Sequence, residues 1–307
     1  KEEIQAKLDA GEPFVIRQNI PTEGTSSYDD LVYGTIHVDY AELEDNILIK
    51  SDGMPTYNFA NVVDDHLMRI SHVIRGTEYL SSTPKYNLMY DTFGWERPKY
   101  IHLPTIMKDA TRKLSKRYGD ANFDDFVNKG YLPEAIINYV ALLGWSPKEN
   151  VEKMTMQQMI DLFSLDGVSK SPSIFDDAKL RWLNGEYLKE LPDEKFEELA
   201  EPFFKKSKVY GKYDLKKLSA LMKTRVEILS EIPEKVDFLE EFGEYDPALF
   251  IHKKMKTNEE TSLEVLPAIR NLIATTEPYT HDALHDAFMQ LATDLGLKNG
   301  QVMWPAR

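Results

Sequence analysis

The first third of the chain alternates between short apolar runs and polar stretches, a pattern typical of β-strands joined by turns. The polar residues 21–30 predict a loop, and residues 2–10 predict a short amphipathic helix that ends before Gly11. The apolar runs predict strands at residues 14–17, 31–36, 46–50, 71–75 and 100–104.

Two helical patterns separate the later strands. Residues 57–68 predict a short strand that continues into a helix. A second helix is predicted to begin at Ser82 or Thr83, with Pro84 in its first turn. The resulting β–α–β–α–β order predicts a parallel sheet with helices on its faces, and such sheets bind ligands at the carboxyl ends of their strands.

The remainder of the chain follows the period of amphipathic α-helices, with prolines between them. Domain boundaries are predicted near residues 116–120 and 189–192. The predicted helices cover residues 132–143, 157–163, 178–184, 193–204, 215–229 and 282–295.

Length and charge narrow the function classes. A chain of 307 residues is long enough for about two domains. Its net charge is 37 − 51 = −14, so a polyanion would have to bind a local basic patch. The absence of cysteine excludes disulfides, a thiol nucleophile and cysteine-bound zinc. The sequence has no apolar run long enough to span a bilayer, which predicts a cytoplasmic protein that does not enter membranes.

One basic segment stands out in this acidic chain, residues 113–117, which read Lys-Leu-Ser-Lys-Arg. Asp109 is the only acid between Arg97 and Arg117, and Gly119 with the polar residues after it predicts a mobile loop. Lysine ammonium groups and a serine hydroxyl on such a loop suit a triphosphate whose charge redistributes during attack. A solvated run of charge is the alternative interpretation of an isolated basic pentamer.

A second group of polar residues surrounds the strand predicted at 71–75. Tyr57 and Asn61 lie four residues apart and share one face of a helix. Arg75 ends the strand, where a guanidinium could bind a carboxylate bidentately, and Glu78 follows as an acceptor for a ribose hydroxyl or a cation. The alternative is a structural ion pair between Arg75 and the acidic residues of the helix.

Two other features carry less weight. His66 and His72 are six residues apart, which matches no common helical spacing for metal ligands, so no metal site is predicted. In the helix at 175–184, Lys179 and Trp182 could contact nucleic acid, but base rates favour a buried tryptophan in the core.

Taken together and in order, these stretches resemble the bacterial-type glutamyl-tRNA synthetases, which are class I aminoacyl-tRNA synthetases. The resemblance runs from about Phe14 to the C-terminus. It rests on residues 50–57, 60–66, 73–76, 81–84, 93–95, 102–104, 113–117, 130–135, 142–147, 182–185 and 300–302.

The resemblance implies a mixed fold, α/β followed by all-α. Residues 1–55 would end an acceptor-stem-binding insertion, and residues 56–118 would form the second half of a Rossmann-type catalytic domain. Residues 119–190 would form a helical stem-contact domain, and residues 191–307 a helical anticodon-binding region that is incomplete at its C-terminus. The implied activity is that of a glutamate–tRNA ligase.

The resemblance also implies site residues. Residues 113–117 look like the KMSKS loop, with Lys116, Lys113 and Ser115 in catalysis. The family's amino-acid substrate is held at positions matched by Tyr57, Asn61 and Arg75, and ATP at positions matched by Glu78, Lys116 and Arg117; Asp65 and Tyr79 match the same pocket more loosely. ATP, with Mg²⁺, glutamate and tRNA are the implied substrates, and a monomer without bound zinc is expected.

One departure from the family is large, because no His-x-Gly-His tetrapeptide exists in these 307 residues. The sequence therefore predicts a fragment that by itself makes no glutamyl-adenylate. A tRNA-binding module without catalysis is the alternative function. A glutaminyl enzyme would end in β-barrels, and the short glutamyl-queuosine enzymes lack an anticodon domain, so both fit the helical remainder less well. The choice between tRNAs for glutamate and for glutamine does not follow from the sequence.

Overall fold

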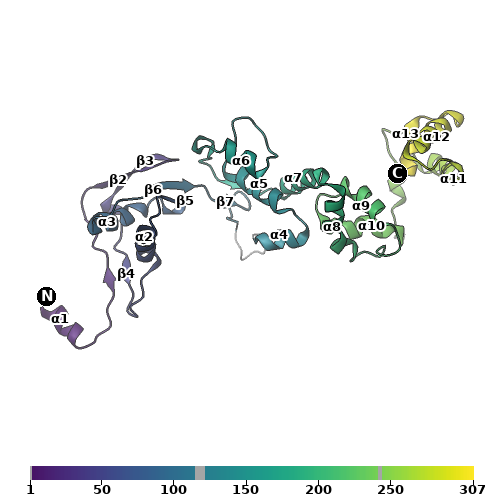
Figure 1. Cartoon of the computed structure of the whole chain (residues 1–307). Helices are drawn as coiled ribbons and strands as arrows, with labels where there is room; N and C mark the ends of the chain where they lie inside the picture. The colour runs from purple at the N-terminus through teal and green to yellow at the C-terminus, as the bar shows by residue number, and fades with distance from the viewer. Residues whose placement is uncertain (1, 115–121, 241–243) are drawn as a thin grey trace. The chain divides into compact units, whose positions relative to one another are not determined.

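A computed structural model describes residues 2–114, 122–240 and 244–307 (Figure 1). The chain forms two compact units, residues 1–236 and 237–307. This division lies some way beyond the boundary predicted near residues 189–192, and the four predicted domain ranges stay predictions. Each unit is described by itself.

The first unit begins with a helix, a two-stranded sheet and a four-stranded main sheet. Helix α1 (Glu2–Asp9) precedes β1 (Ile16–Arg17), which pairs antiparallel with β4 (Ile47–Ile49). The main sheet has four strands in the order β3 (Gly34–Asp39), β2 (Thr25–Asp30), β6 (Lys99–Leu103) and β5 (His72–Gly76). Strands β2 and β3 form an antiparallel hairpin, while β6 runs parallel to both of its neighbours. The predicted parallel pair β5–β6 is confirmed.

Strand β2 corrects the sequence analysis, which assigned residues 21–30 to a loop and residues 31–36 to a strand. Every second residue of β2 is buried, and two of the three, Ser26 and Asp30, are polar. A strand whose inward face carries polar side chains shows no hydrophobic alternation, so the pattern concealed it. Residues 31–33 form the turn of the hairpin instead.

Two helices of the first unit pack together. Helix α2 (Tyr57–Leu67) begins directly after Thr56, so the short strand expected at its start is wrong. Helix α3 (Thr83–Phe93) ends at Gly94, whose φ of 68° favours glycine. Their shared core is made of Val62, Tyr86, Met89 and Tyr90.

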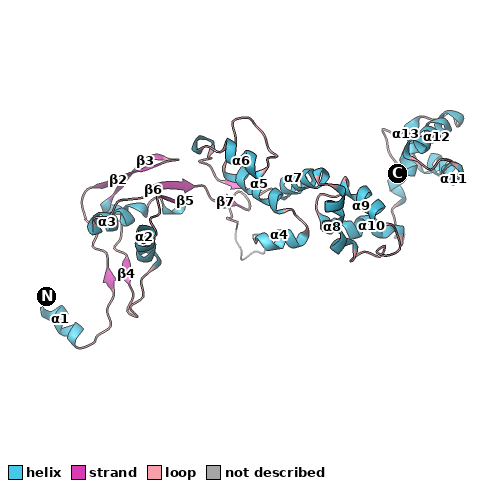
Figure 2. Ribbon diagram, in the orientation of Figure 1, coloured by secondary structure: helices cyan, strands magenta, loops and turns pink. Residues whose placement is uncertain are grey.

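The rest of the first unit is mostly helical, as Figure 2 shows by colour. A short parallel pair, β7 (Ile106–Met107) with β8 (Ser173–Ile174), connects residues far apart in the sequence. Gly130 lies so close to Leu229 that any side chain at position 130 would displace the backbone there. The helices are α4 (Phe123–Lys129), α5 (Pro133–Gly144), α6 (Met156–Leu162), α7 (Asp177–Glu190), α8 (Asp193–Phe204), α9 (Leu215–Lys223) and α10 (Ile232–Val236).

Most predicted helices of this region are confirmed within a few residues, but the one predicted at 215–229 ends at Lys223. The chain then leaves the helical path, and this turn lets Val226 and Leu229 enter the core beside Phe196 and Phe204. Burial of these side chains therefore outweighs continuation of the helix.

The second unit contains α11 (Glu259–Thr275), α12 (His281–Asp294) and α13 (Asn299–Ala306). Their core consists of Val265, Ile269, Ala292 and Val302. Helix α12 was predicted, whereas α11 and α13 were not, and each of these two has a proline inside it. No helix among the described residues combines the length and apolar character that crossing a membrane requires.

Candidate active site

Arg75 lies at the carboxyl end of β5, opposite His102 of β6. Its guanidinium carbon lies 5.1 Å from the ring centre of Tyr79 and 5.2 Å from that of Tyr86. Its Nη2 lies 3.7 Å from a carboxylate oxygen of Asp65 on α2. The guanidinium is therefore held by two aromatic rings and one carboxylate.

Three buried polar atoms at this site have no hydrogen-bond partner among the described residues. They are Nη1 of Arg75 and both the oxygen and the nitrogen of the Asn61 side-chain amide. Leaving such a group unsatisfied costs about 1–3 kcal/mol. Because Asn61 precedes Asp65 by one helical turn, donors and an acceptor without partners gather beside the same guanidinium. This arrangement is typical of a binding site for a polar ligand.

Tyr57 and Glu78 are neighbours of Tyr79, whose ring lies beside the Arg75 guanidinium. The rings of Tyr57 and Tyr79 lie 6.2 Å apart, and a hydrogen bond with Tyr57, together with burial, raises the pKa of Tyr79. Tyr57 is 60% exposed. Glu78, in the 3-10 helix η2 (Thr77–Tyr79), places its carboxylate directly over Gly76, where a Cβ atom would collide with it.

A buried pair that the sequence analysis did not assign to the site supports this end of the sheet. His102 Nδ1 lies 2.7 Å from Asp30 Oδ2, and both side chains are fully buried. Asp30 also accepts the backbone N–H groups of Val32, Tyr33 and His102. The residues 102–104 were noted only as a motif, and nothing in the sequence connected them to Asp30, 72 positions earlier.

A hairpin leads into the basic segment. Leu114 N–H donates to the carbonyl of Ile106, and Lys113 pairs with Met107. Asp109 closes the turn by accepting hydrogen bonds from Thr111 and from the Arg112 side chain, which hold the pKa of Asp109 well below its usual range. Ser115, Lys116 and Arg117, three of the predicted site residues, lie outside the described residues.

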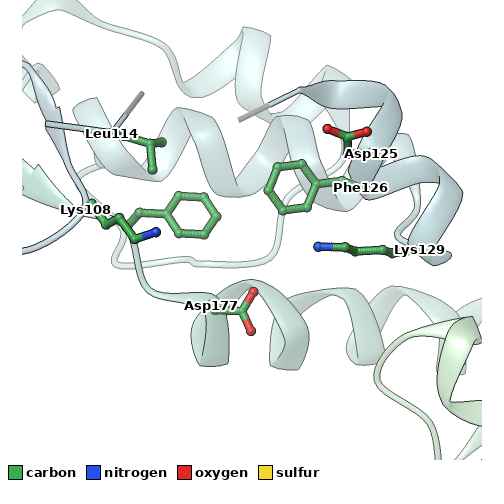
Figure 3. Close-up of a pocket in the computed structure, with 7 residues that line it drawn as sticks. Lys108, Leu114, Asp125, Phe126, Lys129 and Asp177 are labelled. Carbon is green, nitrogen blue, oxygen red and sulfur yellow. The ribbon is translucent and has the colours of Figure 1, made fainter. Parts of the chain in front are cut away.

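A cavity of about 250 Å³ adjoins this hairpin (Figure 3). The ammonium groups of Lys108 and Lys129 and the carboxylate of Asp177 point into the same space as the ring of Phe126. The cavity thus joins the hairpin, α4 and the start of α7.

Helix α7 shows that the prediction of a buried Trp182 in residues 175–184 is wrong. Trp182 is 42% exposed, because the helix turns Leu180 and Leu183 toward the core instead. Asn184 is buried and accepts the backbone N–H of Leu132, and Lys179 forms an ion pair with Glu152.

Comparison with known proteins gives the family. Residues 1–182 match the family described as tRNA synthetases class I (E and Q), catalytic domain. The chain belongs to this family. Residues 195–307 match a second family model, described as an anticodon binding domain. The predicted fold, an α/β class I catalytic region followed by a helical anticodon-binding region, is therefore confirmed.

Individual relatives of this class I synthetase chain agree with the family. Curated glutamate–tRNA ligases of Clostridium botulinum (strain Eklund 17B / Type B) and Clostridium acetobutylicum are each 54% identical to it, across its whole length. A crystal structure of a glutamate tRNA ligase from Elizabethkingia meningosepticum, in complex with its amino acid, matches the whole chain with a TM-score of 0.78 and 32% identity. A glutamate-tRNA synthetase from Elizabethkingia anophelis matches it with a TM-score of 0.77.

The chain spans 63–64% of the length of these curated relatives and 64% of each of the two solved chains.

Proposed function

We propose that the protein carrying these residues is a glutamate–tRNA ligase. A carboxylate oxygen of glutamate attacks the α-phosphorus of ATP, the bond to the β-phosphate breaks, and pyrophosphate leaves. A hydroxyl of the terminal ribose of tRNA then attacks the acyl carbon of glutamyl-adenylate, and AMP leaves. The curated glutamate–tRNA ligases that match the whole chain at 54% identity support this assignment.

The observation that carries the proposal is the group of buried polar atoms without partners at Arg75 and Asn61. Glutamate brings two carboxylates and one ammonium group. A guanidinium N–H donates to a carboxylate in a strong, charge-assisted hydrogen bond, and an amide offers both a donor and an acceptor. Together with the phenol of Tyr57, the side chains of Arg75 and Asn61 would bind the amino acid.

The other predicted site residues would bind ATP. Glu78 would accept a ribose hydroxyl, and Lys116 and Arg117 would contact the phosphates. Lys116, with Lys113 and Ser115, would stabilise the charge that develops on the triphosphate during attack, because in-line phosphoryl chemistry depends on positioning and charge. Mg²⁺ would arrive as a complex with ATP. The protein is expected to act as a monomer in the cytoplasm.

Pyrophosphate exchange into ATP tests the proposal, with the full-length protein and tRNA present. We expect exchange with glutamate and none above background with glutamine or aspartate, because only glutamate offers the side-chain carboxylate at the required distance. Exchange that is absent with glutamate, or equally fast with glutamine, would contradict the proposal.

A tRNA-binding module without catalysis is the second candidate, and the separate match of residues 195–307 to an anticodon binding domain favours it. Such a module would bind tRNA with an affinity that falls steeply with salt, since phosphate contacts release counterions. It would show no exchange with any amino acid. Salt-dependent binding together with no exchange would favour the module over the ligase.

A further inference from the structure

Arg75 is fixed on three sides by the described residues. The rings of Tyr79 and Tyr86 lie on its guanidinium, and Asp65 lies beside Nη2. Only 13% of the Arg75 side chain is exposed. The planar fork of donors is therefore set in one orientation, and Nη1 is the atom left without a partner.

Asp65 approaches this guanidinium from the opposite end of the strand. A hollow of about 440 Å³ lies at the beginning of β5 and β6, where Ser71, His72 and Lys99 line it together with Asp65. The candidate binding atoms lie at the other end, where β5 finishes at Arg75 and Gly76. The carboxylate of Asp65 thus stands between the hollow and Arg75.

The electrostatics of Asp65 agree with this position. Burial raises the pKa of its carboxyl, and the charge of Arg75 opposes that rise. Among the described residues, Arg75 is the only cation that forms an ion pair with Asp65. A half-buried carboxylate with one cationic neighbour acts chiefly on that neighbour.

We propose that Asp65 is a positioning residue, which holds Nη2 of Arg75 so that Nη1 stays directed at a substrate carboxylate, and that Asp65 itself does not touch the substrate. The inference rests on the proposed function, because it takes glutamate as the ligand of Arg75. Orientation of a binding group before the ligand arrives strengthens binding by reducing the ordering that binding requires.

The test compares two ligands in the full-length protein, glutamate and glutarate, the dicarboxylate that lacks the amino group. For Asp65→Ala we expect the KM for glutamate and the inhibition constant of glutarate to rise by the same factor, about tenfold, which is less than for breaking a fully buried ion pair because this pair is only partly buried. Asp65→Asn should be milder, because the amide keeps the shape of the side chain and leaves a polar oxygen beside Nη2. The KM values for ATP and tRNA should not change.

Asp64→Asn is the matched control, because it removes the same charge from an exposed neighbour on the same helix. We expect it to leave both constants unchanged. A rise for glutamate alone would overturn the proposal, since Asp65 would then contact the ammonium group. An equal loss with all three substrates would also overturn it and indicate a purely structural role, as would unchanged constants in Asp65→Ala.

A double-mutant cycle gives an independent measurement. In an Arg75→Ala background, Asp65→Asn should add nothing to the KM for glutamate, because the residue through which Asp65 acts is gone. A full additional effect there would overturn the proposal. Failure of the proposed function is distinguishable, because the unaltered protein would then show no glutamate-dependent exchange at all.

Discussion

The candidate site at Arg75 and the hairpin before Ser115 are held in shape by different kinds of contact. Arg75 is held by residues from α2, η2 and α3, and buried atoms there have no partners. In the hairpin, Asp109 is satisfied by residues two and three positions away, near the surface. Long-range packing thus creates unsatisfied atoms that a ligand can satisfy, whereas the local hydrogen bonds around Asp109 fix the approach to a segment.

This difference predicts that substitutions beneath the Arg75 site lower the free energy of unfolding. Substitutions in the hairpin and the basic segment should mainly lower the rate of adenylate formation. Four experiments test the contrast.

Asp30→Ala should have the largest effect on folding. It removes the acceptor of three backbone N–H groups and of the His102 ring, all buried. We expect the free energy of unfolding to fall by about 3–5 kcal/mol, as when one partner of a buried pair is removed. Chemical denaturation measures it, with Asp29→Ala on the exposed face of β2 as control. Similar losses in the two variants would show that the buried pair contributes no more than a surface residue.

Lys116→Ala should lower the rate of adenylate formation by about 10²–10³-fold, as for loss of one group that stabilises transition-state charge. The free energy of unfolding should not change. Single-turnover formation of adenylate measures the rate, and Lys7→Ala, an exposed lysine of α1, is the control. An unchanged rate in Lys116→Ala removes this residue from the mechanism.

Arg75→Ala should reduce kcat/KM for glutamate by about 10–100-fold, since one or two charge-assisted hydrogen bonds are lost. Arg75→Lys should recover only part of it, because an ammonium group keeps the charge without the planar fork that lies on Tyr79 and Tyr86. Steady-state kinetics with glutamate and ATP varied separately distinguish the roles. Equal effects on both substrates would indicate a structural role for Arg75.

The smallest effect is expected for Asp109→Ala, a few-fold loss in adenylate formation from a looser hairpin. The pKa of Asp109 is depressed, so its stabilising contribution is complete above its ordinary pKa of about 4 and is lost as the pH falls through the depressed value. Amide chemical shifts of Thr111 and Arg112 should therefore stay constant from neutral pH down to about 4 and change below it. A transition at the ordinary pKa would show that the Asp109 hydrogen bonds are not formed in solution.

The sequence predicts those parts of the molecule in which local pattern decides structure. Strands β5 and β6 each contain a short apolar run, and α8 has its expected bounds because Phe196, Ala200 and Phe204 recur at helical spacing and are buried. Strand β2 was not predicted, because two of its buried residues, Ser26 and Asp30, are polar and give no apolar alternation. Pro267 and Pro305 similarly interrupt the patterns of α11 and α13.

The candidate site shows the same limit. The residue types at Tyr57, Asn61 and Arg75 were chosen from the sequence, and the structure brings Arg75 to Asp65, one of the two partners considered for a structural ion pair. Tyr86 was not assigned to the site, because its ring reaches Arg75 only after α3 packs against α2. Spacing along one helix is visible in a sequence, but contact between two helices is not.

The β7–β8 pair determines which part of the first unit holds the start of the basic segment. Lys113 pairs with Met107, Met107 pairs with Ile174, and α7 begins three residues after Ile174. The start of the basic segment is therefore joined through β7 and β8 to the chain that enters α7, whereas Arg75 lies on β5. In the proposed ligase, Lys113 and the residues assigned to glutamate are therefore carried by different parts of the first unit.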